Sequence, residues 1–378
     1  MAKLLDRQRY KCALGAMQTV QAIERALPVL HSGPGCAQKL SDSTGSSGYF
    51  SPNIFPCTSI NEKDVVFGGV KKLDSTIANS LKVIDAIIDQ YLTPSDDKQD
   101  GLINIFADVP YQDLFWLGNI RELERLIKEL GLTPNTIFGY RRGIDNINKI
   151  PHAKYNLLVS PWVGINNMKK MEKKLGIPYL HYKTLPIGAT ETSRFLRTVG
   201  EFAGVSNEKV ESVIKEHEDY YYYLIERYAD LFLENRVINK QFSVVADAHY
   251  ALAITRFLVN DLGLVPAKQF ITDDTPKNMR DDIVKEFNKL NYGLAADVSF
   301  ETDTYKIHEA IREHDYHGYP LILGGYYEKE LTEELKGNFL NISWPVQDKV
   351  VFDSFYAGYA GGIRLIEDIY TVAVSRFN

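Results

Sequence analysis

Short apolar segments alternate with amphipathic helical segments along most of this chain of 378 residues. Residues 102–106 have the character of a buried strand, residues 118–130 repeat apolar side chains with a helical period, and residues 135–138 are apolar again. The same succession recurs from residue 155 and from residue 241. Strands and helices joined by short connections are typical of a parallel sheet with crossover helices. We therefore predict an α/β fold.

A chain of this length exceeds what a single hydrophobic core usually supports, so several domains are expected. The polar segment 93–101 has the composition of a linker, and the helical segment 207–234 separates two strand-helix series. We predict three Rossmann-like, doubly wound parallel-sheet domains. They are an N-terminal domain over residues 1–100, a second over 101–235, and a third with a C-terminal helix over 236–378.

The charge and hydropathy of the chain argue against several classes of function. The formal net charge is -6, so the chain lacks the basic field that nucleic-acid binding requires. No apolar run approaches the roughly 20 residues that span a bilayer, and the first residues lack the apolar core of a signal peptide. We expect a cytoplasmic protein that binds neither nucleic acid nor a membrane.

All three cysteines, Cys12, Cys36 and Cys57, lie within the first 57 residues. An odd number of cysteines in a cytoplasmic chain argues against a disulfide framework. Their spacings of 24 and 21 residues differ from the closely paired ligands of zinc fingers. Ligands this far apart converge from separate loops, which suits thiolates around an iron-sulfur centre. The alternative is that these cysteines are buried as small hydrophobic residues.

Cys36 lies at the tip of a glycine-proline turn. Gly33 and Gly35 permit backbone conformations that are closed to other residues, and Pro34 stiffens the turn between them. This is a tightly specified loop at the end of a short apolar run. A thiol that serves only for packing does not require such a constrained loop. We therefore favour a functional role for Cys36.

The common α/β enzyme motifs are missing from the sequence. The chain has no strict dinucleotide-binding fingerprint, no P-loop and no nucleophile elbow. His314 and His317 have a ligand-like spacing, but no further ligand set is visible near them, so a solvated loop is the favoured interpretation. The cysteines are therefore the main candidates for chemistry.

Four motifs carry a resemblance to a known family. They are YKCALGA at 10–16, HSGPGC at 31–36, EKDVVFGG at 62–69 and YAGYAGGIRL at 356–365. In combination and in this order they resemble the component 1 family of nitrogenases. The last motif, a glycine-tyrosine-glycine lead into a terminal helix, is more similar to the β-type subunits than to the α-type. The resemblance covers nearly the whole chain.

The resemblance implies one subunit of an α/β-type pair, assembled as an α2β2 heterotetramer. Such pairs hold an iron-sulfur cluster, P-cluster-like or 4Fe-4S, at the shared interface, and an ATP-dependent iron protein supplies electrons. The active-site cofactor belongs to the partner subunit. Cys12 and Cys36 match the positions of the family's first two ligands to the interface cluster. The backbone N–H groups of Gly33 and Gly35 are candidates for hydrogen bonds to it.

The first domain departs from the family pattern. The family's third cluster cysteine follows a strand midway through that domain, whereas here residues 79–86 run directly into residues 87–91, as though a section were absent. We therefore expect the first domain to be truncated, and the helical period of residues 73–92 would then join two helix ends. Cys57 is the remaining candidate for a third metal ligand.

Three functional hypotheses follow from the resemblance. The first is an oxidoreductase subunit that relays electrons in a nitrogenase or nitrogenase-like reductase. The second is a scaffold on which a metallocluster is assembled and then handed on. The third, motivated by the missing section, is an inactive structural remnant. A similar fold is by itself a weak basis for assigning reaction chemistry.

Overall fold

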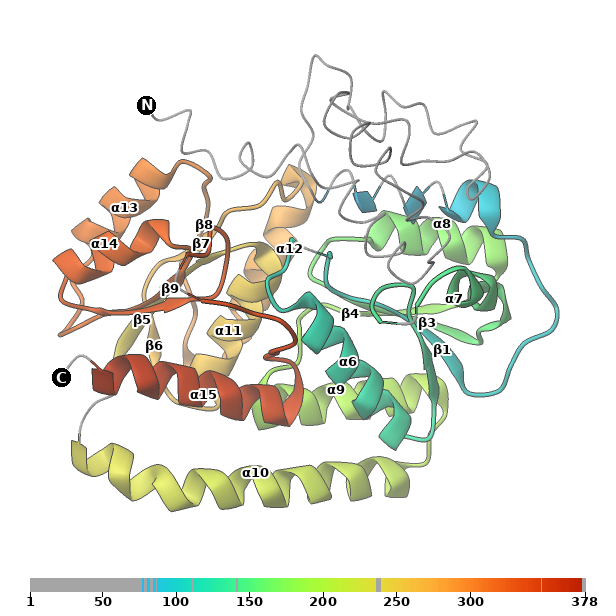
Figure 1. Ribbon diagram of the computed structural model, residues 1–378, viewed down its shortest axis with the longest axis horizontal. Helices are drawn as coiled ribbons and strands as arrows, with labels where there is room; N and C mark the ends of the chain where they lie inside the picture. The colour runs from blue at the N-terminus through green and yellow to red at the C-terminus, as the bar shows by residue number, and fades with distance from the viewer. Residues whose placement is uncertain are drawn as a thin grey trace, which may run out of the picture.

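A computed structural model describes residues 77, 80, 81, 84, 85 and 87–375 of the chain, except residues 111, 141, 236–238 and 348. Most of these residues build two parallel β-sheets with helices packed around them (Figure 1). The first sheet is formed within residues 102–182 and the second within residues 241–341. This arrangement confirms the predicted α/β, Rossmann-like fold class.

The first sheet has the strand order β2-β1-β3-β4, and all its neighbours are parallel. Its two central strands are almost fully buried, because apart from one asparagine in each their buried side chains are apolar. Pro134, which cannot donate a ladder hydrogen bond, lies in the edge strand β2. The strands are β1 (Leu102–Phe106), β2 (Thr133–Asn135), β3 (Tyr155–Val159) and β4 (Tyr179–Tyr182).

The second sheet has the strand order β10-β9-β5-β7-β8, and β6 pairs with β5 outside this path. Its pairs are parallel as well. The sheet is built on β5, whose last five residues are buried. The strands are β5 (Gln241–Ala246), β6 (Val265–Pro266), β7 (Gln269–Ile271), β8 (Val298–Phe300), β9 (Leu321–Gly324) and β10 (Asn338–Asn341).

The helices connect successive strands and cover the sheets (Figure 1). The α-helices are α6 (Trp116–Glu129), α7 (Ile144–Lys149), α8 (Ile165–Leu175), α9 (Gly188–Ala203), α10 (Asn207–Asn235), α11 (Ala248–Asn260), α12 (Lys277–Phe287), α13 (Thr304–Glu313), α14 (Tyr327–Glu334) and α15 (Gly358–Ser375). Shorter helices are the π-helix η4 (Ile87–Tyr91) and the 3-10 helices η5 (Ile150–His152) and η6 (Asn291–Gly293).

Helices α9, α10 and α15 pack against one another, so the C-terminal helix returns to elements that follow the first sheet. All three lie on the same side of the molecule in Figure 1. Glycines permit their closest approach. A Cβ added to Gly362 of α15 would lie 2.6 Å from the Cα of Gly188 in α9. A larger residue at position 362 would therefore force the two backbones apart.

Buried asparagines join three strands of the first sheet. Nδ2 of Asn135 donates to Oδ1 of Asn104 over 2.8 Å, and Nδ2 of Asn104 donates to Oδ1 of Asn156 over 2.8 Å. Asn146 of α7 donates to Oδ1 of Asn135 over 3.0 Å. Because these side-chain amides lie in an interior without water, each must form its hydrogen bonds with the neighbouring asparagines. The chain of hydrogen bonds therefore fixes the register of β2, β1 and β3.

Two element boundaries differ from the sequence expectation. The strand expected at 135–138 lies at Thr133–Asn135, because the edge position accommodates a proline that sequence patterns treat as a break. The terminal helix begins at Gly358, inside the glycine-rich motif that was expected only to lead into it. The domain boundaries at 100 and 235 stay predictions. Most of the expected truncated first domain lies outside the described residues.

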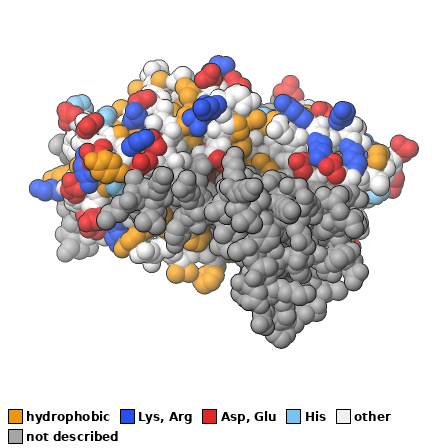
Figure 2. All heavy atoms as spheres, turned by 90° about the horizontal axis from the view of Figure 1, so that it is seen from above, with side chains coloured by type: hydrophobic (Ala, Val, Ile, Leu, Met, Phe, Trp, Pro, Cys, Tyr) orange, Lys and Arg blue, Asp and Glu red, His pale blue; other side chains and the backbone are white. Residues whose placement is uncertain are grey.

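Figure 2 shows lysine, arginine, aspartate and glutamate side chains interspersed on the described surface that faces the viewer. No single sign of charge dominates that surface, in keeping with the modest net charge of -6. Among the described residues, none of the helices has the combination of length and apolar character needed to cross a membrane.

Candidate functional site

The residues that sequence analysis assigns to an iron-sulfur cluster lie outside the described residues. These are Cys12, Cys36 and Cys57 as metal ligands, and Gly33 and Gly35 as backbone donors. Within the described part of the chain, no three side chains of histidine, cysteine, aspartate or glutamate are grouped as a metal site. His314 and His317 do not belong to such a group among the described residues. The cluster residues stay predictions.

The described candidate site lies where the chain leaves the carboxyl ends of strands in both sheets. In open parallel sheets, ligands bind at this edge because the loops that follow the strands converge there. Two hydrogen bonds join the two edges across a large separation in sequence. His249, after β5, meets Asp108, after β1; Trp162, after β3, meets Asp273, after β7.

Asp108 and His249 form a buried pair. Nε2 of His249 lies 3.0 Å from Oδ1 of Asp108, and the two residues are 6% and 3% exposed. An ionised carboxylate only accepts hydrogen bonds, so Nε2 carries the proton and Nδ1 of a neutral ring is an acceptor. Neither Nδ1 of His249 nor Oδ2 of Asp108 has a hydrogen-bond partner among the described residues. The pair therefore leaves two buried polar atoms to be satisfied.

Asn119 of α6 links this pair to the start of the C-terminal helix. Its Nδ2 donates to the hydroxyl of Tyr250 over 2.6 Å and more weakly to Oδ1 of Asp108 over 3.4 Å. Its Oδ1 accepts hydrogen bonds from the backbone N–H groups of Tyr356 and Ala357. Burial raises the pKa of Tyr250 well above its ordinary value, and the negative charge of Asp108 adds to this. The phenol is therefore neutral and serves as a fixed hydrogen-bonding group.

The second contact between the edges is made by a tryptophan. Nε1 of Trp162 donates to Oδ2 of Asp273 over 3.0 Å, and both residues are buried. The same oxygen accepts from the backbone N–H of Ala248 over 3.0 Å, and Oδ1 accepts from the backbone N–H of Thr275. Asp273 thus holds the N-terminus of α11 next to the loop after β3, and this positions His249 one residue further along.

A cleft opens beside Asp108 on the edge of the first sheet. Its cavity volume is about 50 Å³, and the cleft is half open to solvent. Its walls come from the loop after β1, the segment from β3 into α8, and residues 80, 81 and 84. Apolar side chains predominate among the lining residues, and the polar lining residues are Ser80, Asp108 and Asn167. The cleft is therefore small and mainly apolar.

Asn167 closes one side of the cleft. Its Nδ2 donates to Oδ1 of Asp85 over 2.9 Å and to the backbone carbonyl of Leu81 over 3.2 Å. These bonds tie α8 to the helical residues before η4. The donor capacity of Asn167 is therefore used within the protein, which leaves Asp108 as the charged residue of the cleft wall.

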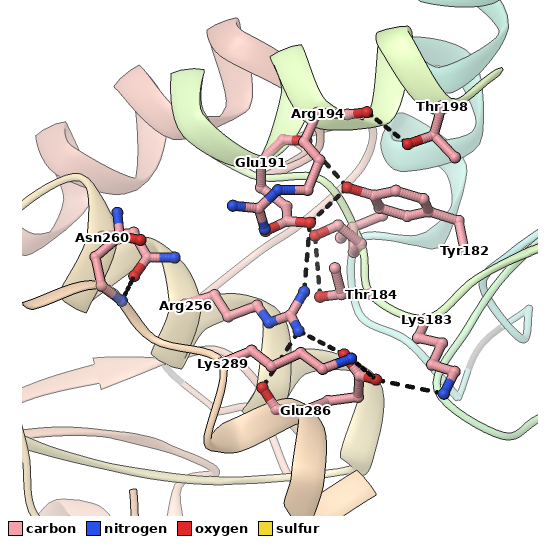
Figure 3. Close-up of polar contacts among 12 residues, drawn as sticks. Tyr182, Lys183, Thr184, Glu191, Arg194, Thr198, Arg256, Asn260, Glu286 and Lys289 are labelled. Atoms are coloured by element: carbon pink, nitrogen blue, oxygen red, sulfur yellow. Dashed lines mark hydrogen bonds and ion pairs between the residues drawn. The ribbon is translucent and has the colours of Figure 1, made fainter. Parts of the chain in front are cut away.

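A separate network of charged residues joins the two sheets (Figure 3). Arg256 of α11 is buried between Glu191 of α9, at 3.3 Å, and Glu286 of α12, at 2.7 Å. The hydroxyl of Tyr182 donates to the same oxygen of Glu191 over 2.5 Å. Lys289 also pairs with Glu286. Because its charges are paired with one another, this network fits a structural role in holding the two sheets together.

The environment of this network explains two pKa shifts. Burial, reinforced by the negative charge of Glu191, raises the pKa of Tyr182 well above its ordinary value. Burial would also raise the pKa of Glu286, but the hydrogen bond from Lys289 and the charges of Arg256 and Lys183 hold that pKa below its usual range. Glu286 therefore stays ionised, and Tyr182 stays neutral, across the neutral pH range.

Sequence analysis did not find Asp108 and His249. The available signal was position alone. Asp108 comes two residues after β1 and His249 three residues after β5, and in a parallel sheet such residues lie at the carboxyl edge. Position did not reveal that residues 141 apart in sequence meet. That contact depends on how the two sheets are placed relative to each other.

The chain matches a family model described as nitrogenase component 1 type oxidoreductase, over residues 12–87 and 80–373. The first matched stretch includes all three cysteines. The two stretches overlap at residues 80–87, within the range where the sequence led us to expect a join. The match covers well over half of the chain.

Two curated relatives are representative. The B subunit of the light-independent protochlorophyllide reductase of Angiopteris evecta is 26% identical over 223 residues, which are 54% of this chain and 42% of that protein. The nitrogenase molybdenum-iron protein beta chain of Clostridium pasteurianum is 22% identical over 328 residues, which are 80% of this chain and 66% of that protein. The matched regions therefore span less than two thirds of either relative.

A solved structure has the same fold. A chain of nitrogenase Cp1 at pH 6.5 superposes with a TM-score of 0.61 at 19% sequence identity, over 80% of this chain and 66% of that chain. A second structure of nitrogenase Cp1, at pH 5, gives a TM-score of 0.56 at 16% identity. At these identities the likeness concerns the fold alone.

Proposed function

This chain belongs to the nitrogenase component 1 type oxidoreductase family, and from that premise we propose that it is the β-type subunit of a nitrogenase or nitrogenase-like reductase. In this role it holds an iron-sulfur cluster at the interface with an α-type subunit. Electrons from an ATP-dependent iron protein pass through this interface to the partner's active-site cofactor. The observation that carries the proposal is the pair of motifs around Cys12 and Cys36 within the family match.

The cluster ligands of this chain are Cys12 and Cys36, with Cys57 as the third. Thiolates are the usual ligands of iron-sulfur clusters, and three thiols from separate loops supply half of a shared site. The backbone N–H groups of Gly33 and Gly35 donate hydrogen bonds that tune the cluster's potential. The cluster is P-cluster-like or 4Fe-4S. It depends on a partner subunit for its remaining ligands.

The β-type assignment has two supports. The relatives include a nitrogenase beta chain and the B subunit of a protochlorophyllide reductase. The β-type motif at 356–365 is also firmly held in the fold. Tyr356, just before α15, is fully buried, and its backbone N–H donates a hydrogen bond to Asn119 of α6. An α2β2 assembly with the α-type partner follows from this assignment.

A scaffold for cofactor assembly is the second candidate function. The overlap of the two matched stretches at residues 80–87 points to a family section that this chain lacks. A scaffold needs an interface and a cluster position but not every element of a catalytic subunit. An inactive remnant is the third candidate.

Co-expression with the α-type subunit from a neighbouring reading frame separates the candidates. The purified complex is supplied with its iron protein, ATP and a reductant under anaerobic conditions. We expect ATP-dependent reduction of a small substrate, measured as product formed per complex. Maturation of a cofactor in a cell extract, without turnover, would assign the scaffold role instead. Absence of both activities would support the inactive remnant.

A further inference from the structure

Helix α10 carries aromatic side chains on its exposed surface. The helix packs against α9 and α15 and lies along the lower edge of the described fold in Figure 1. Tyr221 points into this packing and is 3% exposed, whereas its neighbours Tyr220 and Tyr223 are 65% and 52% exposed. Tyrosine combines a large apolar ring with a polar hydroxyl, so it is enriched where proteins contact one another. The two exposed tyrosines therefore mark a candidate contact surface.

The exposed tyrosines belong to a stripe with a charged residue at each end. The four exposed residues of this stripe, which we call the α10 stripe, are Glu216, Tyr220, Tyr223 and Arg227. They follow one another at intervals of four, three and four residues. At 3.6 residues per turn, these intervals place all four side chains along one line of the helix. The same alternation of three and four residues forms the contact seam between paired helices.

The charges at the two ends of the α10 stripe have no ion-pair partner among the described residues. The ion pairs of α10 in that part of the chain are formed instead by Glu211, Lys215, His217 and Asp219. Arg227 donates to the hydroxyl of Tyr223 over 2.9 Å and lies over its ring. Glu216 and Arg227 are about 16 Å apart along the helix axis, so they cannot pair within one chain. Each charge is therefore available to a partner.

The α10 stripe is complementary to a second copy of itself in the antiparallel orientation. In that register Glu216 faces Arg227 of the second copy, and Tyr220 faces Tyr223 of the second copy. A two-fold axis between the helices generates each contact twice, as an isologous interface requires. The parallel orientation would instead bring like charges together at both ends, which is unfavourable. The order of charges and rings thus favours a second copy of this chain as the occupant.

We propose that two copies of this chain associate through their α10 stripes in the antiparallel orientation. The tyrosine rings form the centre of the contact, and a glutamate-arginine pair closes each end. Asp219, beside the stripe, is already paired with Lys215 of its own helix at 2.7 Å, which limits repulsion at the rim. One helix pair is a small interface, so we expect a reversible association. The proposal goes beyond the proposed function and does not depend on the cluster.

A charge-swap series tests the contact in the full chain, with its partner subunit if one co-purifies. Sedimentation velocity over a range of concentrations measures the association of two copies and its Kd. Glu216→Arg and Arg227→Glu should each raise the Kd at least about tenfold, because like charges then face each other. The variant with both substitutions restores opposite charges and should return the Kd to within about threefold of the wild type. Because the two residues are too far apart to interact within one helix, this recovery reports a contact between copies.

A tyrosine pair supplies a second test with a matched control. Tyr220→Ala removes a ring from the centre of the contact and should weaken the association. Tyr222 is 46% exposed but lies about 100° from Tyr223 around the helix axis, so Tyr222→Ala should leave the Kd unchanged. Circular dichroism checks that each variant is folded, and the tyrosine variants decide the matter if a charge variant is not.

Three results would overturn the proposal. The first is a wild type that holds a single copy of the chain at every concentration. The second is an unchanged Kd in both single charge variants, or in Tyr220→Ala. The third is a doubly substituted variant that associates no more tightly than the single variants, which would assign the stripe to a different partner.

Discussion

Nη2 of Arg256 lies 2.7 Å from Oε2 of Glu286, and both residues are 5% exposed. The same guanidinium reaches Glu191 on α9, which follows the first sheet, while Glu286 lies on α12, between strands β7 and β8 of the second sheet (Figure 3). One cation therefore neutralises carboxylates from both halves of the described fold. Burying such ions is unfavourable unless they are paired, so each depends on the others.

Replacing Arg256 should destabilise the protein strongly. Arg256→Leu leaves the buried carboxylate of Glu191 without its partner from α11, and we expect a loss of about 3–5 kcal/mol in the free energy of unfolding. Urea unfolding followed by circular dichroism measures it. Arg197→Leu is the matched control, because its ion pair with Glu211 is exposed and is worth about 0–1 kcal/mol. Equal losses in the two variants would contradict the structural role of Arg256.

Asp261 should make stability depend on pH in the mildly acidic range. Burial raises the pKa of Asp261 to about 6, an effect that Thr190 partly opposes. The unfolded chain has a pKa of about 3.9 at this residue, so the folded state binds more protons between these two values. The group's stabilising contribution is complete below about pH 3.9 and is lost as the pH rises through about 6.

The difference in unfolding free energy between the wild type and Asp261→Asn isolates this effect. We expect the wild type to lose up to about 3 kcal/mol relative to the variant between pH 4 and pH 6.5. Urea midpoints at several pH values measure the difference, and the many other carboxylates cancel in the comparison. A difference that is constant across this range would show that Asp261 titrates normally.

Gly362 should tolerate no side chain. In Gly362→Ala the new Cβ would lie 2.6 Å from the Cα of Gly188, so α15 and α9 must separate. Overpacking of this kind typically costs about 1–3 kcal/mol. Thermal unfolding of this variant should show a lower midpoint, whereas Ala360→Ser, on the exposed face of the same helix, should stay within about 0.5 kcal/mol of the wild type. An unchanged midpoint for Gly362→Ala would contradict the close helix contact.

Local sequence patterns were sufficient for the central strands of the fold. The segments at 102–106, 155–159 and 241–246 are apolar and bounded by turn residues, and the strands β1, β3 and β5 lie there. Patterns were insufficient at the edges. Strand β2 contains a proline, and β8, with three half-buried residues, carries too weak an apolar signal to be recognised.

The candidate sites differ in how far sequence could lead. Cys12 and Cys36 could be identified as candidates because residue type and turn chemistry are local properties of the sequence. Both residues lie outside the described part of the chain. Asp108 and His249 carry no local signal, since an aspartate or a histidine after a strand is common. Their contact arises only when two sheets formed by distant segments are brought together. Long-range packing of this kind cannot be read from spacing.

The iron content of the complex tests the proposed cluster most directly. The chain is co-purified anaerobically with its α-type partner, once as the wild type and once as Cys36→Ala. We predict iron and sulfur-to-iron charge-transfer absorption in the wild-type complex, and a joint loss of iron and of the partner subunit in the variant. A wild-type complex without iron, or a Cys36→Ala complex with full iron and a normal partner, would contradict the proposal.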